Sequence, residues 1–391
     1  MKMIADERIL FRSPAPDGIY CYTPWICHGF GDRLIASCDI AGPRLGEVPG
    51  PKSDHGDYGS NQCLIFRSDD HGETWTLCAR LPMLHARVFQ AGKSLYILGH
   101  SGRMLIARSD DNGDSWSAPA VLDPGLRWHQ SGGSIDRHHG RIWLSMEIKP
   151  DVDHWAGGDP LLMSADENDD LTKRSSWRFS NLVTFEQTAK FINRTPIQFE
   201  ADCWLESSVV RVHDPKSRFY DPEDRSVLLF LRVNGCEHYA AMLVGRENDD
   251  GTLTLDTWKR PDGSPVIFFP FPGGHMKFHI VYDEQDQFYW MTASHVEIST
   301  AYGPPSNRER RALGLYCSSN LFDWQFAGFV AVGESRLCSR HYASLVIDGE
   351  DLLVVSRSGD REAKNSHDTD LITLHRVRRF RELALKGGRE E

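Results

Sequence analysis

The chain has 391 residues, 40% of them apolar and 25% charged, which is typical of a globular protein. It carries 44 Lys and Arg against 55 Asp and Glu, a formal net charge of −11, and this argues against a protein that coats nucleic acid. No stretch approaches the roughly 18 apolar residues of a transmembrane helix, and the first residues lack the apolar core of a signal peptide. We therefore expect no nucleic-acid or membrane partner, and a cytoplasmic protein or an exported one whose leader has been removed.

Short β-type segments recur along the whole chain, and Gly, Asp, Asn and Pro separate them. In chain order the clearest are residues 33–38, 94–98, 104–107, 141–146, 227–233, 289–293 and 352–356. The longer period of amphipathic helices is hard to find. Short strands at fairly regular spacing, with turn residues between them, predict an all-β sandwich, barrel or propeller.

A repeated motif favours the propeller. Residues 68–75 (SDDHGETW) and 109–116 (SDDNGDSW) both read S-x-D-x-G-x-[ST]-W, and their offset of about 41 residues is close to the length of a four-stranded blade. The Ser and Asp side chains satisfy backbone groups of a tight turn, Gly supplies an unusual φ, and Trp packs between sheets. The motif is therefore structural, and we assign it no catalytic role.

These two motifs resemble the Asp-boxes, or BNR repeats, of the sialidase-like β-propellers. The resemblance implies an all-β fold, a six- or seven-bladed β-propeller with Asp-box turns, formed by residues 1–391 as a single domain. We expect residues 371–377 to complete a blade with N-terminal sequence, because such closure removes exposed strand edges. In this family three arginines bind a substrate carboxylate, a Tyr paired with a Glu is the nucleophile, and an Asp is the acid/base.

The C-terminal part follows the family's order of third arginine, turn and nucleophilic tyrosine before Ser-Leu. The resemblance therefore implies that Tyr342 is the nucleophile. It implies that Arg311 binds the carboxylate, with Arg308 or Arg310 as alternatives. Arg340, two residues before the tyrosine, is a further candidate for substrate binding.

The middle of the chain repeats the family pattern of a Glu, an apolar strand, a turn and a second apolar strand that ends in Arg. The resemblance implies that Glu206 polarises the tyrosine and that Arg232 is the second carboxylate ligand. Arg232 also follows four apolar residues, and burial of a guanidinium requires a partner or a wet cavity. A structural ion pair remains the alternative interpretation.

The N-terminal part departs from the family. Tyr22 occupies the place of the first arginine, and a phenol does not replace the bidentate guanidinium fork. This argues against a typical sialidase. The candidate acid is Asp57, or Asp54, in the polar loop before the first box.

Histidines are a second set of candidate catalytic residues, because the chain has 17 of them. His129 and His341 are candidates to transfer protons, and His, Tyr and Arg together are the residues that β-elimination of a uronate-containing glycan requires. His275 and Lys277 alternate with His279, which predicts that they share one strand face that lines the channel. His138 and His139 adjoin a turn, and we expect no metal site and no cofactor.

These features predict a carbohydrate-active enzyme that cleaves a glycosidic bond beside an anionic, uronate-type or deoxy sugar in an oligo- or polysaccharide. Hydrolysis by a sialidase-like glycoside hydrolase is ranked first. A polysaccharide lyase acting on ulvan-like or rhamnose–glucuronate glycans is the close alternative, and a non-catalytic glycan-binding propeller is the third. The sequence does not indicate the sugar, the linkage or the oligomeric state.

Overall fold

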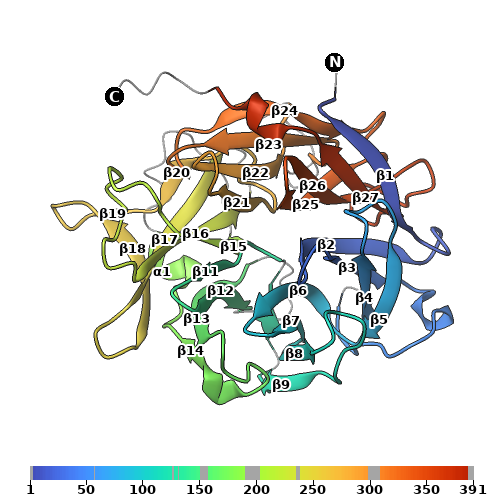
Figure 1. Cartoon of the computed structure of the whole chain (residues 1–391), viewed down its shortest axis with the longest axis horizontal. Helices are drawn as coiled ribbons and strands as arrows, with labels where there is room; N and C mark the ends of the chain where they lie inside the picture. The colour runs from blue at the N-terminus through green and yellow to red at the C-terminus, as the bar shows by residue number, and fades with distance from the viewer. Residues whose placement is uncertain are drawn as a thin grey trace.

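The structure is a computed structural model and describes residues 3–56, 58–125, 127–130, 132–149, 157–189, 203–234, 238–297 and 309–385. Six antiparallel sheets are arranged around a common axis as the blades of a β-propeller (Figure 1). The described part has very little helix. The predicted all-β propeller is confirmed, and the number of blades is six.

The blades follow one another in chain order. Blade 1 consists of β2 (Tyr20–His28), β3 (Leu34–Ala41), β4 (Asn61–Ser68) and β5 (Thr76–Leu81). Blade 2 consists of β6 (Leu84–Ala91), β7 (Ser94–Ser101), β8 (Arg103–Ser109) and β9 (Ala120–Asp123). Blade 3 consists of β10 (Trp128–His129), β11 (Asp136–His138), β12 (Arg141–Ile148), β13 (Asp159–Asp166) and β14 (Trp177–Phe179).

The second half of the chain forms the other three blades. Blade 4 consists of β15 (Trp204–Val210), β16 (Ser226–Val233), β17 (Tyr239–Glu247), β18 (Leu253–Lys259), β19 (Pro265–Val266) and β20 (Phe268–Pro270). Blade 5 consists of β21 (His279–Asp283), β22 (Phe288–Ser294), β23 (Ala312–Ser318) and β24 (Gln325–Val332). Blade 6 consists of β25 (Arg340–Asp348), β26 (Asp351–Ser358), β27 (Leu371–Val377) and β1 (Ala5–Arg12).

The helical segments are short. They are α1 (Phe185–Ala189) and 3₁₀ turns at Leu45–Glu47, Arg174–Ser176 and Phe380–Leu383. Within the described residues, no helix has the length and apolar character needed to cross a membrane.

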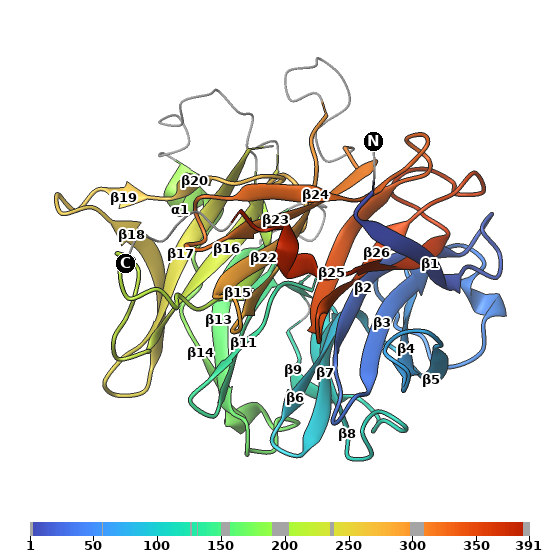
Figure 2. The same cartoon turned by 45° about the horizontal axis from the view of Figure 1, so that its top comes forward.

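The N-terminal strand closes the ring. β1 pairs antiparallel with β27 and so becomes the outermost strand of blade 6. The N-terminal strand therefore lies at the outer edge of the last blade, as Figure 2 shows from a tilted view. At the other end of the described chain, Leu385 N donates to Gln325 Oε1 of β24 in blade 5 (3.2 Å). The predicted pairing of residues 371–377 with N-terminal sequence is confirmed.

The hydrophobic core lies between neighbouring blades. For example, Leu98 and Ile106 of blade 2 pack in one buried cluster with Leu144 and Met163 of blade 3. Each blade is therefore apolar on both faces, which explains why its middle strands have continuous apolar runs.

The two box motifs form equivalent turns. In the first, Ser68 Oγ donates to Asp70 Oδ1 (2.7 Å) and accepts from Gly72 N (2.8 Å), while Asp70 Oδ1 also accepts from Thr74 N (2.9 Å). The same three hydrogen bonds, with lengths of 2.8, 2.8 and 2.9 Å, recur in residues 109–116. Gly72 has a φ of +85°, which a residue with a Cβ adopts rarely.

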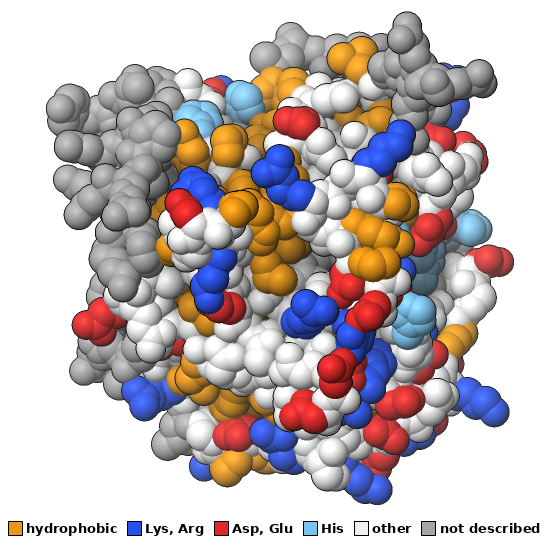
Figure 3. Space-filling view, turned by 90° about the vertical axis from the view of Figure 1, so that its left-hand side faces the viewer, with side chains coloured by type: hydrophobic (Ala, Val, Ile, Leu, Met, Phe, Trp, Pro, Cys, Tyr) orange, Lys and Arg blue, Asp and Glu red, His pale blue; other side chains and the backbone are white. Residues whose placement is uncertain are grey.

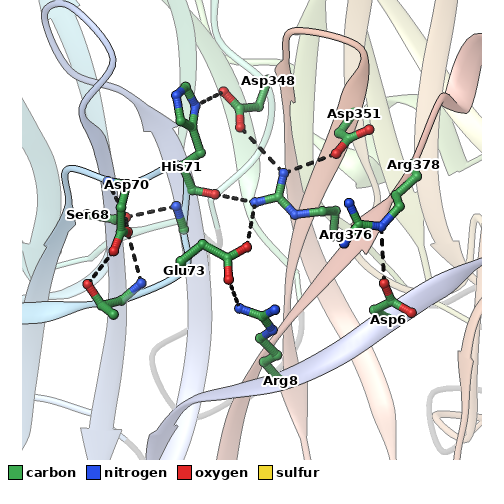
Figure 4. Close-up of polar contacts among 12 residues, drawn as sticks. Asp6, Arg8, Ser68, Asp70, His71, Glu73, Asp348, Asp351, Arg376 and Arg378 are labelled. Atoms are coloured by element: carbon green, nitrogen blue, oxygen red, sulfur yellow. Dashed lines mark hydrogen bonds and ion pairs between the residues drawn. The ribbon is translucent and has the colours of Figure 1, made fainter.

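Figure 4 shows that the first turn also joins blade 1 to blade 6. His71 Nδ1 contacts Asp348 Oδ1 at 3.0 Å. Glu73 pairs with Arg8 of β1 and lies 3.7 Å from Arg376 of β27. These ion pairs lie at the surface, so each one stabilises the closure only slightly.

One irregularity recurs in four of the six strands that open the blades. β2, β6, β15 and β25 each carry a bulge in which one extra residue is inserted relative to the neighbouring strand. At each bulge one residue adopts a left-handed backbone: Thr23 (φ 31°), His85 (φ 55°), Glu206 (φ 57°) and Tyr342 (φ 54°). A non-glycine residue with this conformation is strained, and such strain is concentrated at functional sites.

Candidate active site

A cavity of about 700 Å³ lies where all six blades meet. It is lined by Tyr22, Thr23, Ala41, Asn61, Leu84, His85, His129, Lys149, Leu205, Glu206, Arg232, Arg310, Tyr342, Arg357, Asn365, Ser366 and His367. Among these residues four carry Lys or Arg side chains and one carries a carboxylate. By contrast, Lys/Arg and Asp/Glu side chains intermingle on the outer face of the molecule shown in Figure 3. The cavity is therefore suited to an anionic ligand.

The bulges direct the cavity side chains. Thr23, His85, Glu206 and Tyr342 all line the cavity, because an extra left-handed residue re-aims its side chain away from the regular alternation of a strand. Carboxylates from neighbouring blades satisfy two of the bulged amides: His85 N donates to Asp39 Oδ2 (2.7 Å) and Glu206 N donates to Glu147 Oε2 (2.8 Å).

The second strand of each bulged blade supplies a polar partner at the same register. The residue just before the bulge pairs with Asp39 in blade 1, His100 in blade 2, Arg232 in blade 4 and Arg357 in blade 6. All four partners are at most 3% exposed. A common backbone frame therefore places a different pair of polar side chains in each of these blades.

Tyr342, Glu206 and Arg232 form the centre of the site. The Tyr342 hydroxyl donates to Glu206 Oε1 at 2.5 Å and accepts from Arg232 Nη1 at 2.5 Å. Arg232 Nη1 also contacts Glu206 Oε2 at 3.0 Å. Burial raises the pKa of the Tyr342 phenol, although Arg232 opposes the shift, so the phenol is neutral at pH 7 and is poised to give its proton to Glu206.

Three guanidinium groups surround the phenol. The Cζ atoms of Arg232, Arg310 and Arg357 lie 5.9, 5.4 and 5.5 Å from the centre of the Tyr342 ring. Burial lowers the pKa of Arg310 to about 9, so it still carries its charge at pH 7. Arg310 Nη1 contacts Nδ1 of the buried His341 at 3.2 Å. Three planar cations converging in one cavity are suited to bind a carboxylate.

A second group of polar side chains lies beside Arg357. Asp368 accepts hydrogen bonds from the hydroxyls of Tyr22 (2.8 Å) and Tyr58 (2.7 Å) and contacts His367 Nδ1 (2.8 Å). Burial and the charge of Arg357 lower the pKa of His367 to about 4, so its imidazole is neutral at pH 7. Arg357 lies over the Tyr22 ring at 4.3 Å, which holds both side chains in place.

Histidines form the wall contributed by blades 2 and 3. His85 Nδ1 lies 2.9 Å from His100 Nε2, and His129 Nδ1 lies 2.5 Å from Glu147 Oε1. His85 and His129 line the cavity, whereas His100 is fully buried behind them. Burial lowers the pKa of both His85 and His100 well below the usual value.

The structure brings five of the predicted site residues to the cavity: Tyr22, His129, Glu206, Arg232 and Tyr342. Arg311 does not line it, because its guanidinium pairs with Glu297 and donates to the Gly333 carbonyl (2.9 Å). The alternative, Arg310, lines the cavity instead. Arg340 also lies outside it, paired with Glu7 of β1 at 2.7 Å.

Three further candidates lie behind the cavity wall. The predicted strand face of His275 and Lys277 does not form, because β21 begins only at His279 and the preceding residues make a turn. Lys277 Nζ donates to the carbonyls of Tyr342 (3.3 Å) and Ala343 (3.1 Å), and the His275 carbonyl accepts from Arg232 Nε (2.7 Å). These residues and His341 support the site without lining it. Asp57 lies outside the described residues, and the other candidate acid, Asp54, is exposed and does not line the cavity.

Sequence reasoning missed Arg357, His85 and Glu147 as site residues. For Arg357 a signal was present, because it ends an apolar run (LLVVSR) in the same way as Arg232 (LLFLR). For His85 and Glu147 no comparable signal exists, since their places depend on the bulge and on strand pairing.

A second hollow, of about 470 Å³, is lined by later residues of several of the inner strands. Most of its lining is apolar, from residues such as Ile26, Val88, Val209 and Leu345. Its two arginines, Arg137 and Arg211, pair with Glu167 and Asp224. The three arginines of the first cavity instead surround Tyr342, and we therefore take the first cavity as the candidate active site.

Comparison with solved structures places this architecture among sialidase-type propellers. A protein of unknown function from Dyadobacter fermentans superimposes with a TM-score of 0.58 at 14% identity, covering 95% of this chain and 97% of that one. An α-L-arabinanase from Penicillium chrysogenum, complexed with arabinobiose, superimposes with a TM-score of 0.55 at 11% identity, covering 97% of this chain and 99% of that one. A Trypanosoma rangeli sialidase mutant that displays trans-sialidase activity superimposes with a TM-score of 0.58 at 15% identity, covering 95% of this chain and 59% of that one.

At these identities the likeness concerns the fold alone, and the chain has the fold of the sialidase-like propellers. No protein-family model and no curated protein sequence matches the chain.

Proposed function

We propose that the protein is a glycoside hydrolase that cleaves a glycosidic bond beside a carboxylate-bearing sugar. The observation that supports this most strongly is the 2.5 Å hydrogen bond from the Tyr342 hydroxyl to Glu206, in a cavity that three arginines line. Tyrosine paired with a carboxylate is a nucleophile suited to an anionic sugar, because a bare carboxylate would repel the substrate.

The proposed reaction begins when Tyr342 Oη attacks the anomeric carbon and passes its proton to Glu206. Arg232, already hydrogen bonded to this oxygen, stabilises the negative charge that develops on it. An acid protonates the leaving oxygen. Its conjugate base then takes a proton from the water that attacks the anomeric carbon, and Glu206 returns its proton to Tyr342 Oη as the glycosyl–tyrosine bond breaks. The resemblance implies Asp57, or Asp54, as the acid.

In this proposal Arg232, Arg310 and Arg357 bind the substrate carboxylate. Arg357 comes from blade 6 and lies beside Tyr22, the residue in the family's first-arginine position. Arg357 would therefore supply the third guanidinium in place of the family's first arginine. A uronate-type sugar is therefore the proposed substrate class.

The test is a panel of glycans that carry a uronate or another acidic sugar, each paired with its methyl ester. We expect new reducing ends from the acid form and a rate at least about 30-fold lower for the ester, because a buried charge-assisted contact contributes about 2 kcal/mol or more. Equal rates for acid and ester would contradict the proposal, and binding without turnover would favour a glycan-binding module.

A lyase is the second candidate, and the two carboxylate-held imidazoles favour it. His129 contacts Glu147 and His367 contacts Asp368, both on the wall of a cavity that also holds arginine and tyrosine. In β-elimination the arginines would neutralise the uronate and an imidazole would remove the adjacent proton. The C–O bond would then break as a double bond forms, and a tyrosine or second histidine would protonate the leaving oxygen. The same panel separates the two, because elimination produces an ultraviolet-absorbing unsaturated uronate and hydrolysis does not.

A further inference from the structure

The imidazole rings of His85, His100 and His129 form a nearly equilateral triangle at the cavity wall. Their centroids lie 5.0 Å (His85–His100), 4.9 Å (His85–His129) and 5.4 Å (His100–His129) apart. The ring planes are inclined to one another by 50°, 79° and 57°. The three rings are therefore not stacked, which leaves their nitrogen edges able to face a common point.

This triangle has the size of a three-histidine metal site. With metal–nitrogen bonds of about 2.0–2.1 Å at tetrahedral angles, imidazole centroids lie about 5.2 Å apart. One candidate ligand nitrogen of each histidine lies within 4.8 Å of the other two.

The surroundings of the triangle resemble the outer shell of a metal site. Glu147 Oε1 lies 2.5 Å from His129 Nδ1, which leaves Nε2 as the ligand atom. A carboxylate that holds the far nitrogen of a histidine is the usual partner of a metal-bound imidazole. The backbone of His85 is fixed in the bulge by Asp39 (2.7 Å), so two of the three ligands are held before any metal binds.

We propose that His85, His100 and His129 bind a divalent metal ion of the zinc type, with an open coordination position that faces the cavity. His85 and His129 line the cavity and His100 lies behind them, so the unliganded side of the ion is the cavity side. Three imidazoles with one open position are the ligand set of catalytic zinc sites. The open position would take water or a hydroxyl oxygen of the bound sugar.

Binding requires a small rearrangement. His85 Nδ1 and His100 Nε2 lie 2.9 Å apart, and they must separate to about 3.3 Å around a tetrahedral ion. The proton of His100 moves to Nδ1, so the 3.4 Å contact from the Gly102 amide is released. The metal–nitrogen bonds replace both contacts.

The test uses the full chain after chelator dialysis, titrated with Zn²⁺ by calorimetry and with Co²⁺ by visible absorption. We expect one ion per chain and the intense visible bands of tetrahedral Co²⁺. His85→Gln and His129→Gln should each weaken Zn²⁺ binding by more than about 100-fold, and Glu147→Gln by about 10- to 100-fold. His139→Gln is the matched control, because His139 is exposed and lies outside the cavity.

Equal Zn²⁺ affinity for the wild-type chain and His129→Gln would overturn the inference, provided that circular dichroism shows both folded. An equal loss in His139→Gln would overturn it too, because binding would then be non-specific. The inference does not depend on Tyr342 as the nucleophile. A chain that binds one Zn²⁺ but cleaves no glycan would contradict only the proposed function, and one that cleaves glycans without binding Zn²⁺ would contradict only this inference.

Discussion

The box turns and the inner-strand bulges are both repeated in this propeller, but in opposite ways. The turns at residues 68–75 and 109–116 share their residues and their hydrogen bonds. The bulges share their backbone, with one extra left-handed residue in each strand, but the residues there differ: Thr23, His85, Glu206 and Tyr342.

This difference reflects where each side chain directs its polar atoms. In the turn, both oxygens of Asp70 accept hydrogen bonds from Ser68 and Thr74 of the same turn. At a bulge the backbone is held by strand pairing and, at His85 and Glu206, by a carboxylate of another blade. The side chain at a bulge can therefore face the cavity. In this propeller the motif that repeats in its residues belongs to the scaffold, and the feature that repeats only in its backbone conformation belongs to the candidate site.

The largest effect on kcat is expected when the reactive group of a bulge residue is replaced. Glu206→Gln should lower kcat by about 10²- to 10⁴-fold, because the amide cannot accept the Tyr342 proton, while KM changes little. Steady-state kinetics on the glycan that the panel identifies measures this. Glu247→Gln, which removes a carboxylate paired with Arg141 and Arg178 outside the cavity, should leave kcat unchanged, and equal losses in both variants would contradict the assignment.

Substitution of the adjacent residues Arg310 and Arg311 compares an arginine that lines the cavity with one that lies outside it. Arg310→Met should raise KM for the acidic glycan by about 30- to 4,000-fold, because a buried charge-assisted contact contributes about 2–5 kcal/mol. Arg311→Met should change KM little, since Arg311 pairs with Glu297 outside the cavity. If Arg311→Met had the larger effect, the carboxylate site would be misplaced.

Substitutions in the box turns should change the free energy of unfolding but not the catalytic constants. Asp70→Ala removes an acceptor that holds Ser68 and Thr74, and it should lower the free energy of unfolding by about 1–2 kcal/mol. The values of kcat and KM should stay at the wild-type level. Urea unfolding and kinetics on the same preparation measure both, and a large fall in kcat with unchanged stability would break the distinction between scaffold and site.

The smallest expected effect is a pH dependence of the same turns. Hydrogen bonds from Thr74 and Ser115 lower the pKa of Asp70 and Asp111 from 3.8 to about 2. A lowered folded-state pKa means that the unfolded chain binds protons first, so this stability is present above about pH 4 and is lost as the pH falls toward 2. The double variant D70N/D111N should show a shallower loss of melting temperature over this range, and an unchanged slope would contradict the prediction.

The sequence was sufficient to predict the scaffold and the three residues at the centre of the site. The repeat of Ser, Asp, Gly and Trp predicted the propeller, because its offset of about 41 residues is close to the length of one blade. Glu206, Arg232 and Tyr342 were predicted because their order along the chain resembles that of the sialidase-like family. The number of blades stayed open, because only two of the six blades carry a complete box.

The rest depended on pairing and on local turns that a sequence does not display. Arg310 and Arg311 are adjacent and both precede β23, so spacing alone did not decide which of them lines the cavity. His100 and Arg357 reach the site because each lies opposite a bulge in the neighbouring strand. The alternation of His275 and Lys277 predicted a strand face, but the strand begins two residues after Lys277.

The most direct test of the account is the rate of Tyr342→Phe against that of Tyr316→Phe on one acidic glycan. Both changes remove only a buried hydroxyl, and Tyr316 contacts His295 (3.0 Å) outside the cavity. We predict a loss of kcat on the order of 10⁴-fold for Tyr342→Phe and a wild-type rate for Tyr316→Phe. A wild-type rate for Tyr342→Phe would contradict the claim that the bulged tyrosine of the last blade breaks the bond.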